Sequence, residues 1–225
     1  MVSTLYQVRP DVFPSLQHVQ EIPSSPLNSN TRQLQLKNIS GLLMHGHVWN
    51  GQDPTGWFIS EKLDGFRAFW DGSKLYSRNG HILPVPLEFT HAFPADISLD
   101  GELWTGNDFH KIDSILKKTT RLLEQNNDTE LWKDVKYCVF DAPMHPGNYA
   151  ERHAFASHFS STNLCVIPFV TCLGQDHLQT MLHQITSKKG EGIMLYHPSS
   201  KYVPGRTNLV LKVKSYEEED VKFIK

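Results

Sequence analysis

Short apolar runs separated by turn signals constrain the fold of this 225-residue chain more than any other feature. The dipeptides Asp71-Gly72 and Asn79-Gly80 have the chemistry of tight hairpin turns, which predicts antiparallel pairing of the runs beside them. The runs themselves have the length and composition of strands. We therefore predict strands over residues 57–60, 66–70, 74–77, 98–104, 136–140, 164–170, 193–196 and 209–213.

Helices are predicted between these strands. Apolar residues recur at the i, i+3, i+4 spacing of an amphipathic helix over residues 112–123 and again over residues 178–185. The second pattern ends at Lys188-Lys189-Gly190, a basic last turn followed by a glycine stop. A third helix is predicted over residues 149–159. Antiparallel sheets flanked by helices make an α+β domain.

Composition divides the chain into three parts. Residues 1–35 are rich in Pro, Ser and Asn, which predicts an irregular, extended segment rather than a helix. Residues 36–214 carry the predicted strands and helices, and residues 215–225 begin a linker that contains an acidic run. The 39% content of hydrophobic residues is typical of a globular protein. No apolar run reaches the length of about 18 residues that a membrane span needs, so we predict no contact with a membrane.

Lys62 is the candidate nucleophile, within the sequence Ser60-Glu61-Lys62-Leu63-Asp64-Gly65-Phe66-Arg67. A lysine amine is a poor nucleophile while it is protonated, so an enzyme that uses one has to favour its neutral form. The neighbours supply a carboxylate at Asp64, a close-approach backbone position at Gly65 and a fixed cation at Arg67. Taken alone, this pattern fits a solvated charged turn between two strands equally well.

Two further lysines, Lys212 and Lys214, lie two positions apart in the last predicted strand. That spacing places both ammonium groups on one face of the strand, with Leu211 and Val213 on the other. Like charges on one face repel each other unless an anion lies between them. The alternative for this pair is an edge strand that lysines protect from aggregation.

The polar clusters of the chain form an ordered series. They are Lys62-Leu63-Asp64-Gly65-Phe66-Arg67, Ser77-Arg78-Asn79-Gly80, Asp100-Gly101-Glu102, Tyr137-Cys138-Val139-Phe140-Asp141, Glu191-Gly192-Ile193-Met194 and Lys212-Val213-Lys214. This series resembles the motifs of covalent nucleotidyltransferases, and specifically of ATP-dependent DNA ligases, most closely the minimal ligases of bacteria and viruses. The resemblance implies a ligase-type, ATP-grasp-like domain whose two sheets hold the nucleotide between them.

The resemblance also implies a role for each cluster. Lys62 would attack the α-phosphorus of ATP to form a lysyl-AMP intermediate. The AMP would then pass to a 5′-phosphate at a DNA nick, which the 3′-hydroxyl seals. Lys212 and Lys214 would contact the α-phosphate, because point charges can follow a phosphate as its geometry inverts. Glu102 would accept hydrogen bonds from the ribose hydroxyls, and Phe140 would stack on the adenine.

The remaining nucleotide-site residues surround these. Ser60 and Glu61 precede the nucleophile, and Ser60 would make a polar contact with the adenine edge. Arg67 and Arg78 would bind the sugar and phosphates of the nucleotide, or the incoming 5′-phosphate, through their forked guanidinium groups. The resemblance further implies Mg²⁺, held through oxygen ligands by Glu191 and Asp64, with Asp64 also counted among the catalytic residues.

The net charge of the chain neither indicates nor excludes a nucleic-acid partner. The net charge is −2 and the sequence pI about 6.6, so there is no overall cationic field. Local basic residues could still contact phosphates. The candidates are Lys111, Lys117, Lys118, Arg121, Lys188, Lys189, Lys201 and Arg206. We predict a monomer that acts on nicked double-stranded DNA.

Three alternatives stay open. An RNA ligase would use the same lysine, acids and paired lysines, since discrimination of the 2′-hydroxyl is not visible in one sequence. A capping-type guanylyltransferase would differ in the base it accepts. A non-catalytic nucleotide-binding or nucleic-acid-binding module would keep the fold without the chemistry.

The cysteines indicate the cellular environment. Cys138, Cys165 and Cys172 have no zinc-site spacing, and three is an awkward number for a disulfide scaffold. We predict that they are reduced apolar residues of an intracellular protein, with nucleus, organelle and cytoplasm not distinguished.

Ligases of this kind normally continue into an OB-fold domain. Only residues 215–225 follow the lysine pair, too few for a five-stranded barrel. We therefore expect a catalytic domain cut from a longer protein, which adenylates itself and seals nicks poorly when alone.

Overall fold

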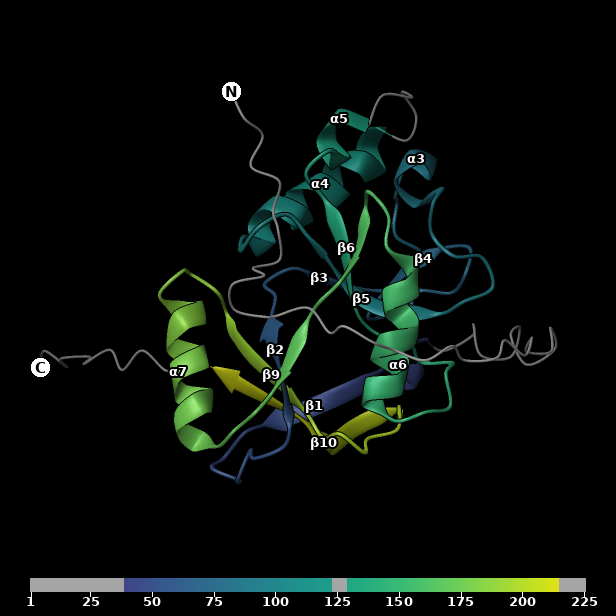
Figure 1. Cartoon of the computed structure of the whole chain (residues 1–225). Coiled ribbons are helices and arrows are strands. Elements are labelled where there is room, and N and C mark those ends of the chain that lie inside the picture. Colours follow the sequence, from purple (N-terminus) through teal and green to yellow (C-terminus); the bar gives the residue numbers. More distant parts are fainter. Residues whose placement is uncertain (1–38, 123–128, 215–225) are drawn as a thin grey trace, which may run out of the picture.

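The computed structural model describes residues 39–122 and 129–214, which form two five-stranded sheets with helices on their outer faces (Figure 1). The first sheet has the order β1 (Met44–Val48), β10 (Gly205–Lys214), β9 (Gly192–Tyr196), β2 (Phe58–Lys62) and β8 (Phe169–Thr171). The second has the order β4 (Leu75–Ser77), β3 (Phe66–Trp70), β5 (Leu99–Trp104), β6 (Lys136–Asp141) and β7 (Leu164–Val166). The predicted α+β fold is confirmed.

The sheets are antiparallel except at one edge of each. β1 runs parallel to β10, and β7 runs parallel to β6. The hairpin of β3 and β4 turns at Asp71-Gly72, as predicted, and Gly72 has φ of 93°, the left-handed conformation that glycine adopts without steric cost. The backbone N–H groups of Ser73 and Lys74 donate to the Asp71 carboxylate and close the turn.

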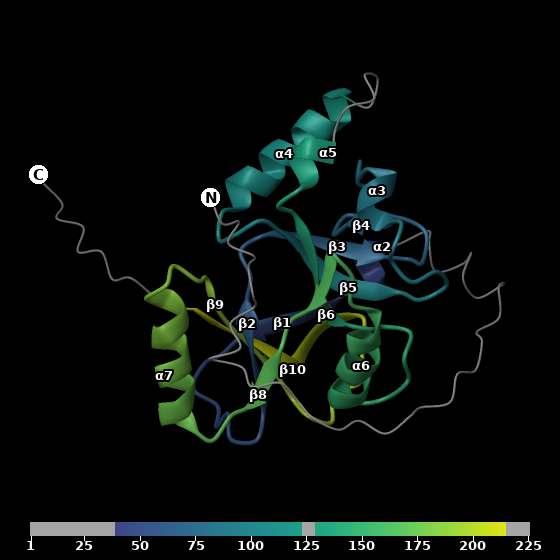
Figure 2. The same cartoon turned by 45° about the horizontal axis from the view of Figure 1, so that its top comes forward.

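Helix α7 (Gln175–Thr186) covers the outer face of the first sheet. Leu178, Met181, Leu182 and Ile185 pack against β2, β9 and β10, which is the helical stripe that the sequence predicts. On the second sheet, α4 (Phe109–Leu122) and α5 (Thr129–Trp132) lie together, as Figure 2 shows, and they share a hydrophobic cluster with α3 (Leu87–Thr90). The short helix α2 (Ile39–Leu42) precedes β1. None of the helices in the described ranges is both long and apolar enough to cross a membrane.

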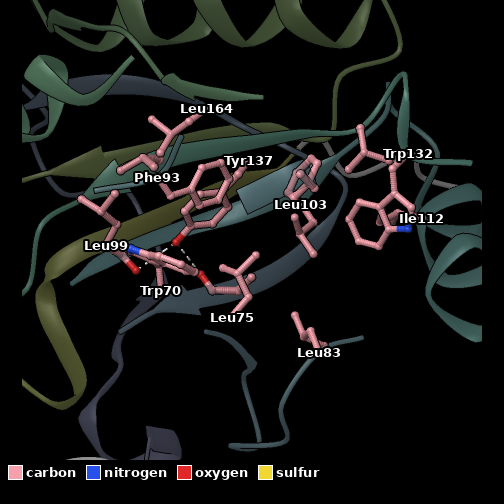
Figure 3. Packing of buried hydrophobic residues seen from close by; sticks show 14 of the residues in the cluster. Trp70, Leu75, Leu83, Phe93, Leu99, Leu103, Ile112, Trp132, Tyr137 and Leu164 are labelled. Carbon is pink, nitrogen blue, oxygen red and sulfur yellow. Dashed lines mark hydrogen bonds between the residues drawn. The ribbon is translucent and has the colours of Figure 1, made fainter. Parts of the chain in front are cut away.

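The largest hydrophobic cluster lies between the second sheet and its helices (Figure 3). The buried ring of Tyr137 stacks beside Phe93, with ring centroids 5.4 Å apart. The Tyr137 hydroxyl lies 2.9 Å from the carbonyl oxygen of Leu99 and 3.1 Å from that of Ala68. The phenol thus ties β6 to β5 and β3, which fixes the strands that carry three of the polar clusters.

Helix α6 (Tyr149–Ala156), followed by the 3₁₀ turn η2 (Ser157–Phe159), joins the two sheets. Asn148 and Glu151 form a capping box at its start, so the first backbone N–H groups are satisfied. Tyr149 stacks on Tyr196 of β9 at a centroid distance of 4.0 Å. From the same helix, the fully buried Arg152 pairs with Asp141 of β6 through Nε–Oδ1 at 2.6 Å and Nη2–Oδ2 at 3.0 Å.

The predicted strands differ from the structure in two places. The run at 164–170 is two strands in different sheets, because the chain crosses from one to the other at Pro168, which has no N–H to continue a ladder. Strand β1, which contains His45 and His47, was not predicted. Residues 1–38 and 215–225, including the predicted irregular segment and linker, lie outside the described residues.

Candidate active site

A cavity of about 200 Å³ lies between the two sheets. Strands β1, β2, β9 and β10 of the first sheet and β3, β5 and β6 of the second contribute to its lining. Seven residues that the sequence singled out lie in this lining: Glu61, Lys62, Arg67, Arg78, Glu102, Phe140 and Lys212. They come from five different polar clusters, so the fold brings together residues that are up to 151 positions apart (61 to 212).

Lys62 is the last residue of β2, opposite Gly192 of β9. Its Nζ forms an ion pair with the carboxylate of Glu191, and Lys214 Nζ lies 2.8 Å from the other oxygen of that carboxylate. The sequence predicts an anion beside the pair of Lys212 and Lys214, and the Glu191 carboxylate is that anion for Lys214. Burial alone would raise the pKa of Glu191, but the hydrogen bonds from Lys214 and Lys62 hold it below its ordinary value. Glu191 is therefore ionised at neutral pH.

Gly65 allows the turn after Lys62 to approach β5 closely. A Cβ atom at this position would lie 2.5 Å from the carbonyl oxygen of Leu103 and 2.8 Å from Cγ of Glu102. Such distances are well inside van der Waals contact, so a larger residue would push the turn away from β5. The close-approach position that the sequence indicates is where the segment carrying the nucleophile meets the strand carrying Glu102.

Glu102 and Phe140 form part of the second sheet's side of the cavity. Burial is the main cause that raises the pKa of Glu102 to about 8, while the cations of Lys62 and Arg67 oppose the rise. The carboxyl group is therefore poised to gain or lose a proton near neutral pH. Phe140 is half-buried and lies under the Arg67 guanidinium, with Cζ 5.4 Å from the ring centroid.

Arg67 forms hydrogen bonds with other protein groups that the sequence did not predict. Its Nε and Nη2 donate to the two oxygens of buried Asp100, at 3.1 and 2.7 Å, and Nη2 also donates to the Met44 carbonyl at 2.8 Å. Tyr202 donates to the same carboxylate at 2.6 Å. Burial works against the charge on Arg67, but the Asp100 carboxylate raises its pKa further above the ordinary value. Much of the guanidinium fork is thus used to join β1, β3 and β5.

Cations from both sheets surround Lys212 of β10. Burial lowers the pKa of Lys212, and the cations of Lys62, Arg206, Arg78 and Arg67 lower it further. Repulsion of this kind is relieved when an anion enters the cavity. The arrangement therefore favours a negatively charged ligand, and phosphate groups satisfy that requirement.

His45 of β1 also lines the cavity. Its Nδ1 is 3.3 Å from Nη1 of Arg67. Burial, with Arg67 and Arg78 nearby, lowers the pKa of His45 to about 4, so the ring is neutral at pH 7 and can accept a hydrogen bond from the guanidinium. Within residues 39–122 and 129–214, no three His, Cys, Asp or Glu side chains form a group that could hold a metal ion by themselves.

Four of the sequence-predicted residues lie outside the cavity lining. The buried hydroxyl of Ser60 donates to the Pro168 carbonyl at 3.1 Å. Asp64 is half-buried in the turn after β2. Glu191 reaches the site through its ion pair with Lys62, and Lys214 through its ion pair with Glu191, rather than as part of the lining.

Sequence reasoning gave no role to His45, Asp100 or Tyr202. Asp100 lies in the Asp-Gly-Glu cluster, and its place between apolar residues was a signal that its carboxylate would be buried and would need a cation. Tyr202 carried no local signal.

Comparison with known proteins decides the family. The profile described as ATP dependent DNA ligase domain matches residues 47–214, which is most of the chain. The chain belongs to the ATP-dependent DNA ligase family. A DNA ligase of Haemophilus influenzae is 33% identical over 187 residues, which cover 81% of this chain and 66% of that protein. This ligase domain thus spans just under two thirds of that relative's length.

Solved structures agree on the fold of this ligase domain. A structure from a study of Lig E DNA ligases as a minimal DNA-binding scaffold has a TM-score of 0.69 at 30% identity and covers 78% of this chain and 69% of that one. Chlorella virus DNA ligase-adenylate has a TM-score of 0.59 at 18% identity, with 76% of this chain and 66% of that one covered. Bacteriophage T7 DNA ligase in complex with ATP has a TM-score of 0.56 at 14% identity, over 78% and 69% of the two chains. The last two likenesses concern the fold alone.

Proposed function

We propose that this domain forms a covalent lysyl-AMP intermediate on Lys62 from ATP, passes the AMP to a 5′-phosphate at a DNA nick, and seals the nick with the 3′-hydroxyl. One observation carries the proposal. Lys62 lines a cavity together with a carboxyl group, an aromatic ring and further cations, which are supplied by Glu102, Phe140 and Lys212 among others. These groups match the parts of a nucleoside monophosphate: the ring can stack on the base, the carboxyl group can accept hydrogen bonds from the ribose, and the cations can bind the phosphate.

Each chemical step is a displacement at phosphorus. In the first, the Lys62 nitrogen bonds to the α-phosphorus of ATP, the bond to pyrophosphate breaks, and the lysine loses its protons to the surroundings. In the second, an oxygen of the DNA 5′-phosphate displaces the lysine amine. In the third, the 3′-hydroxyl displaces AMP. Positioning and charge neutralisation supply most of the catalysis for such steps.

The side chains divide these tasks. Phe140 offers a face on which adenine can stack, and Glu102 offers oxygens to the ribose hydroxyls. Lys212 faces the same cavity from the opposite sheet, and its repulsion by other cations disappears when the α-phosphate arrives. Glu191 holds Lys62 and Lys214 in place before the nucleotide binds. Arg67, already engaged by Asp100, mainly shapes the cavity, while exposed Arg78 is available to phosphate.

Mg²⁺ fits this site as a companion of the nucleotide. Glu191 supplies one ionised carboxylate near the phosphate-binding region, and Mg²⁺ is commonly held by one or two carboxylates together with substrate phosphates and water. Bound there, it would neutralise phosphate charge. Asp64, half-buried outside the lining, is the second candidate ligand from the sequence.

Nicked DNA is the proposed substrate. All eight basic residues that the sequence offers as phosphate contacts have exposed side chains in the structure, among them Lys118 and Arg121 on α4, Lys188 and Lys189 after α7, and Arg206 on β10. Lys117 is partly neutralised by Asp113, at 2.7 Å. Contacts of this kind position a duplex without reading its sequence.

The test of this proposal is transfer of labelled AMP to the protein. The protein, with Mg²⁺, is incubated with ATP or GTP labelled at the α-phosphate, or with nicked duplex that carries labelled AMP on its 5′-phosphate. We expect acid-labile covalent label from ATP and from the adenylated nick, and none from GTP. The adenylated nick matters because it supplies AMP without the first step.

Two variants sharpen the result. Lys62→Arg keeps a cation beside Glu191 but has no amine of comparable nucleophilicity, so it should lose the label while keeping its melting temperature. Lys74→Ala removes an exposed lysine of the β3–β4 turn, away from the proposed DNA contacts, and should keep the label. Labelling of the Lys62→Arg protein at the parent's level would refute the assignment of the nucleophile.

A further inference from the structure

Two cysteines face each other across a pair of strands. Cys138 of β6 and Cys165 of β7 are direct partners in the parallel register, and their Sγ atoms are 3.3 Å apart. Neighbouring strands lie about 4.8 Å apart, inside the range of about 4.4 to 6.8 Å that disulfides span between Cα atoms. The sulfur atoms need to approach by a little over 1 Å to reach a bond length of about 2.0 Å. Rotation about the two Cα–Cβ bonds can supply that approach.

We propose that Cys138 and Cys165 are a site of reversible disulfide formation, driven by hydrogen peroxide as oxidant. The thiolate of Cys165 attacks one peroxide oxygen, the O–O bond breaks, and a sulfenic acid and hydroxide form. The sulfur of Cys138 then attacks the sulfenic sulfur, the S–O bond breaks, and the displaced hydroxide takes up the thiol proton as water. Two electrons pass from the two sulfur atoms to the peroxide. The hydroxide from the first step takes up the proton that the Cys165 thiol released on ionising, so the peroxide leaves as two molecules of water.

The two thiols differ in exposure and in pKa, as this order of steps requires. Cys165 is half-buried and reachable by a small oxidant, whereas Cys138 is buried and 1% exposed. The hydrogen bond with Cys138 lowers the pKa of Cys165, burial opposes this, and the nearby Lys136 cation lowers it further. Cys165 thus attacks first and Cys138 resolves the sulfenic acid.

The third cysteine provides an internal control. Cys172 follows β8 in the other sheet, and its Sγ lies 3.3 Å from the carbonyl oxygen of Gly174. It is buried, and burial raises the pKa of its thiol. Both features make it slower to react than Cys165.

The bond would lie beside the nucleotide cavity without belonging to its lining. Cys138 pairs directly with Glu102 across β5 and β6, and both cysteines share a hydrophobic cluster with Phe140 and Trp104. Closing the bond joins the edge strand β7 to β6 and encloses α6 in a loop. A loop of this size is expected to raise the melting temperature by about 5 °C or more.

The experiment treats the full chain with hydrogen peroxide, then blocks free thiols with an alkylating reagent and maps the peptides by mass spectrometry. The reduced protein has three free cysteines. After oxidation we expect one alkylated cysteine, Cys172, a cross-linked pair of peptides carrying Cys138 and Cys165, and a higher melting temperature. Dithiothreitol should restore all three thiols and the original melting temperature.

Three variants complete the design. Cys172→Ser should keep the cross-link and the rise in melting temperature. Cys165→Ser and Cys138→Ala should each lose both, and either one suffices if the other fails to fold. Three alkylatable cysteines after peroxide, a sulfinic acid at Cys165 with Cys138 still free, or a cross-link that involves Cys172 would each overturn the proposal.

Discussion

Replacing Glu102 by Gln is expected to remove a large part of the pH dependence of this protein's stability. Burial raises the pKa of Glu102 from 4.5 to about 8 in the folded state. Between these values the folded protein holds a proton that the unfolded chain has lost, so the free energy of unfolding falls as the pH rises. Above pH 8 the full cost of the buried charge is present, and below pH 4.5 it is absent.

The size of the effect follows from the gap between the two pKa values. At about 1.36 kcal/mol for each pH unit, a gap from 4.5 to about 8 corresponds to at most about 5 kcal/mol. Water that reaches the half-buried carboxylate reduces this value, so we expect about 2 to 4 kcal/mol. Gln has the same shape and no charge. The free energies of unfolding of Glu102→Gln and the parent should therefore differ by only a small offset near pH 5. Above that pH, Glu102→Gln should become progressively more stable than the parent, up to pH 9.

Urea unfolding, followed by circular dichroism at intervals between pH 5 and pH 9, measures this difference directly. Other groups titrate in the same range, but they are common to both proteins and cancel in the comparison. Glu88→Gln, at an exposed position on α3, is the matched control and should follow the parent at every pH. A constant difference in stability between Glu102→Gln and the parent from pH 5 to pH 9 would show that the pKa of Glu102 is not raised in the folded protein.

Three further changes test other parts of the structure. Asp141→Ala leaves the buried guanidinium of Arg152 without its carboxylate and should cost about 3 to 5 kcal/mol of stability in urea unfolding; a loss below about 1 kcal/mol would contradict a buried pair. Gly65→Ala places a Cβ atom 2.5 Å from the Leu103 carbonyl and should cost about 1 to 3 kcal/mol, with an unchanged midpoint arguing against the close approach. Phe140→Ala should weaken ATP binding by about 1 to 3 kcal/mol in calorimetry, whereas Phe140→Tyr keeps the aromatic face and should bind nearly as well as the parent.

Local sequence patterns predicted the elements whose structure is decided locally. The β3–β4 hairpin follows from Asp71-Gly72, because a tight turn fixes which residues pair beside it. The buried stripe of α7 follows from apolar residues at helical spacing. The alternation in Lys212-Val213-Lys214 predicted that Val213 would be buried and that the lysines would share the other face, and the burial pattern of β10 agrees.

Elements that depend on distant partners were harder to predict. Strand β1 has the sequence Met-His-Gly-His-Val, which lacks a clear apolar alternation, and it is a strand because it pairs with β10 some 160 residues later. Likewise, Arg67 looked free to bind phosphate, but Asp100 and the Met44 carbonyl occupy much of its guanidinium. The apolar surroundings of Asp100 indicate a buried carboxylate, but no local pattern identifies Arg67 as its partner or β10 as the partner of β1.

The most direct test of the account is to identify the residue that carries the nucleotide. After incubation with ATP, or with adenylated nicked DNA, the protein is digested under neutral conditions and its peptides are mapped by mass spectrometry. We expect AMP on the side chain of Lys62 and on no other residue. AMP on a different residue, or an intact Lys62 in protein that has demonstrably become adenylated, would contradict it.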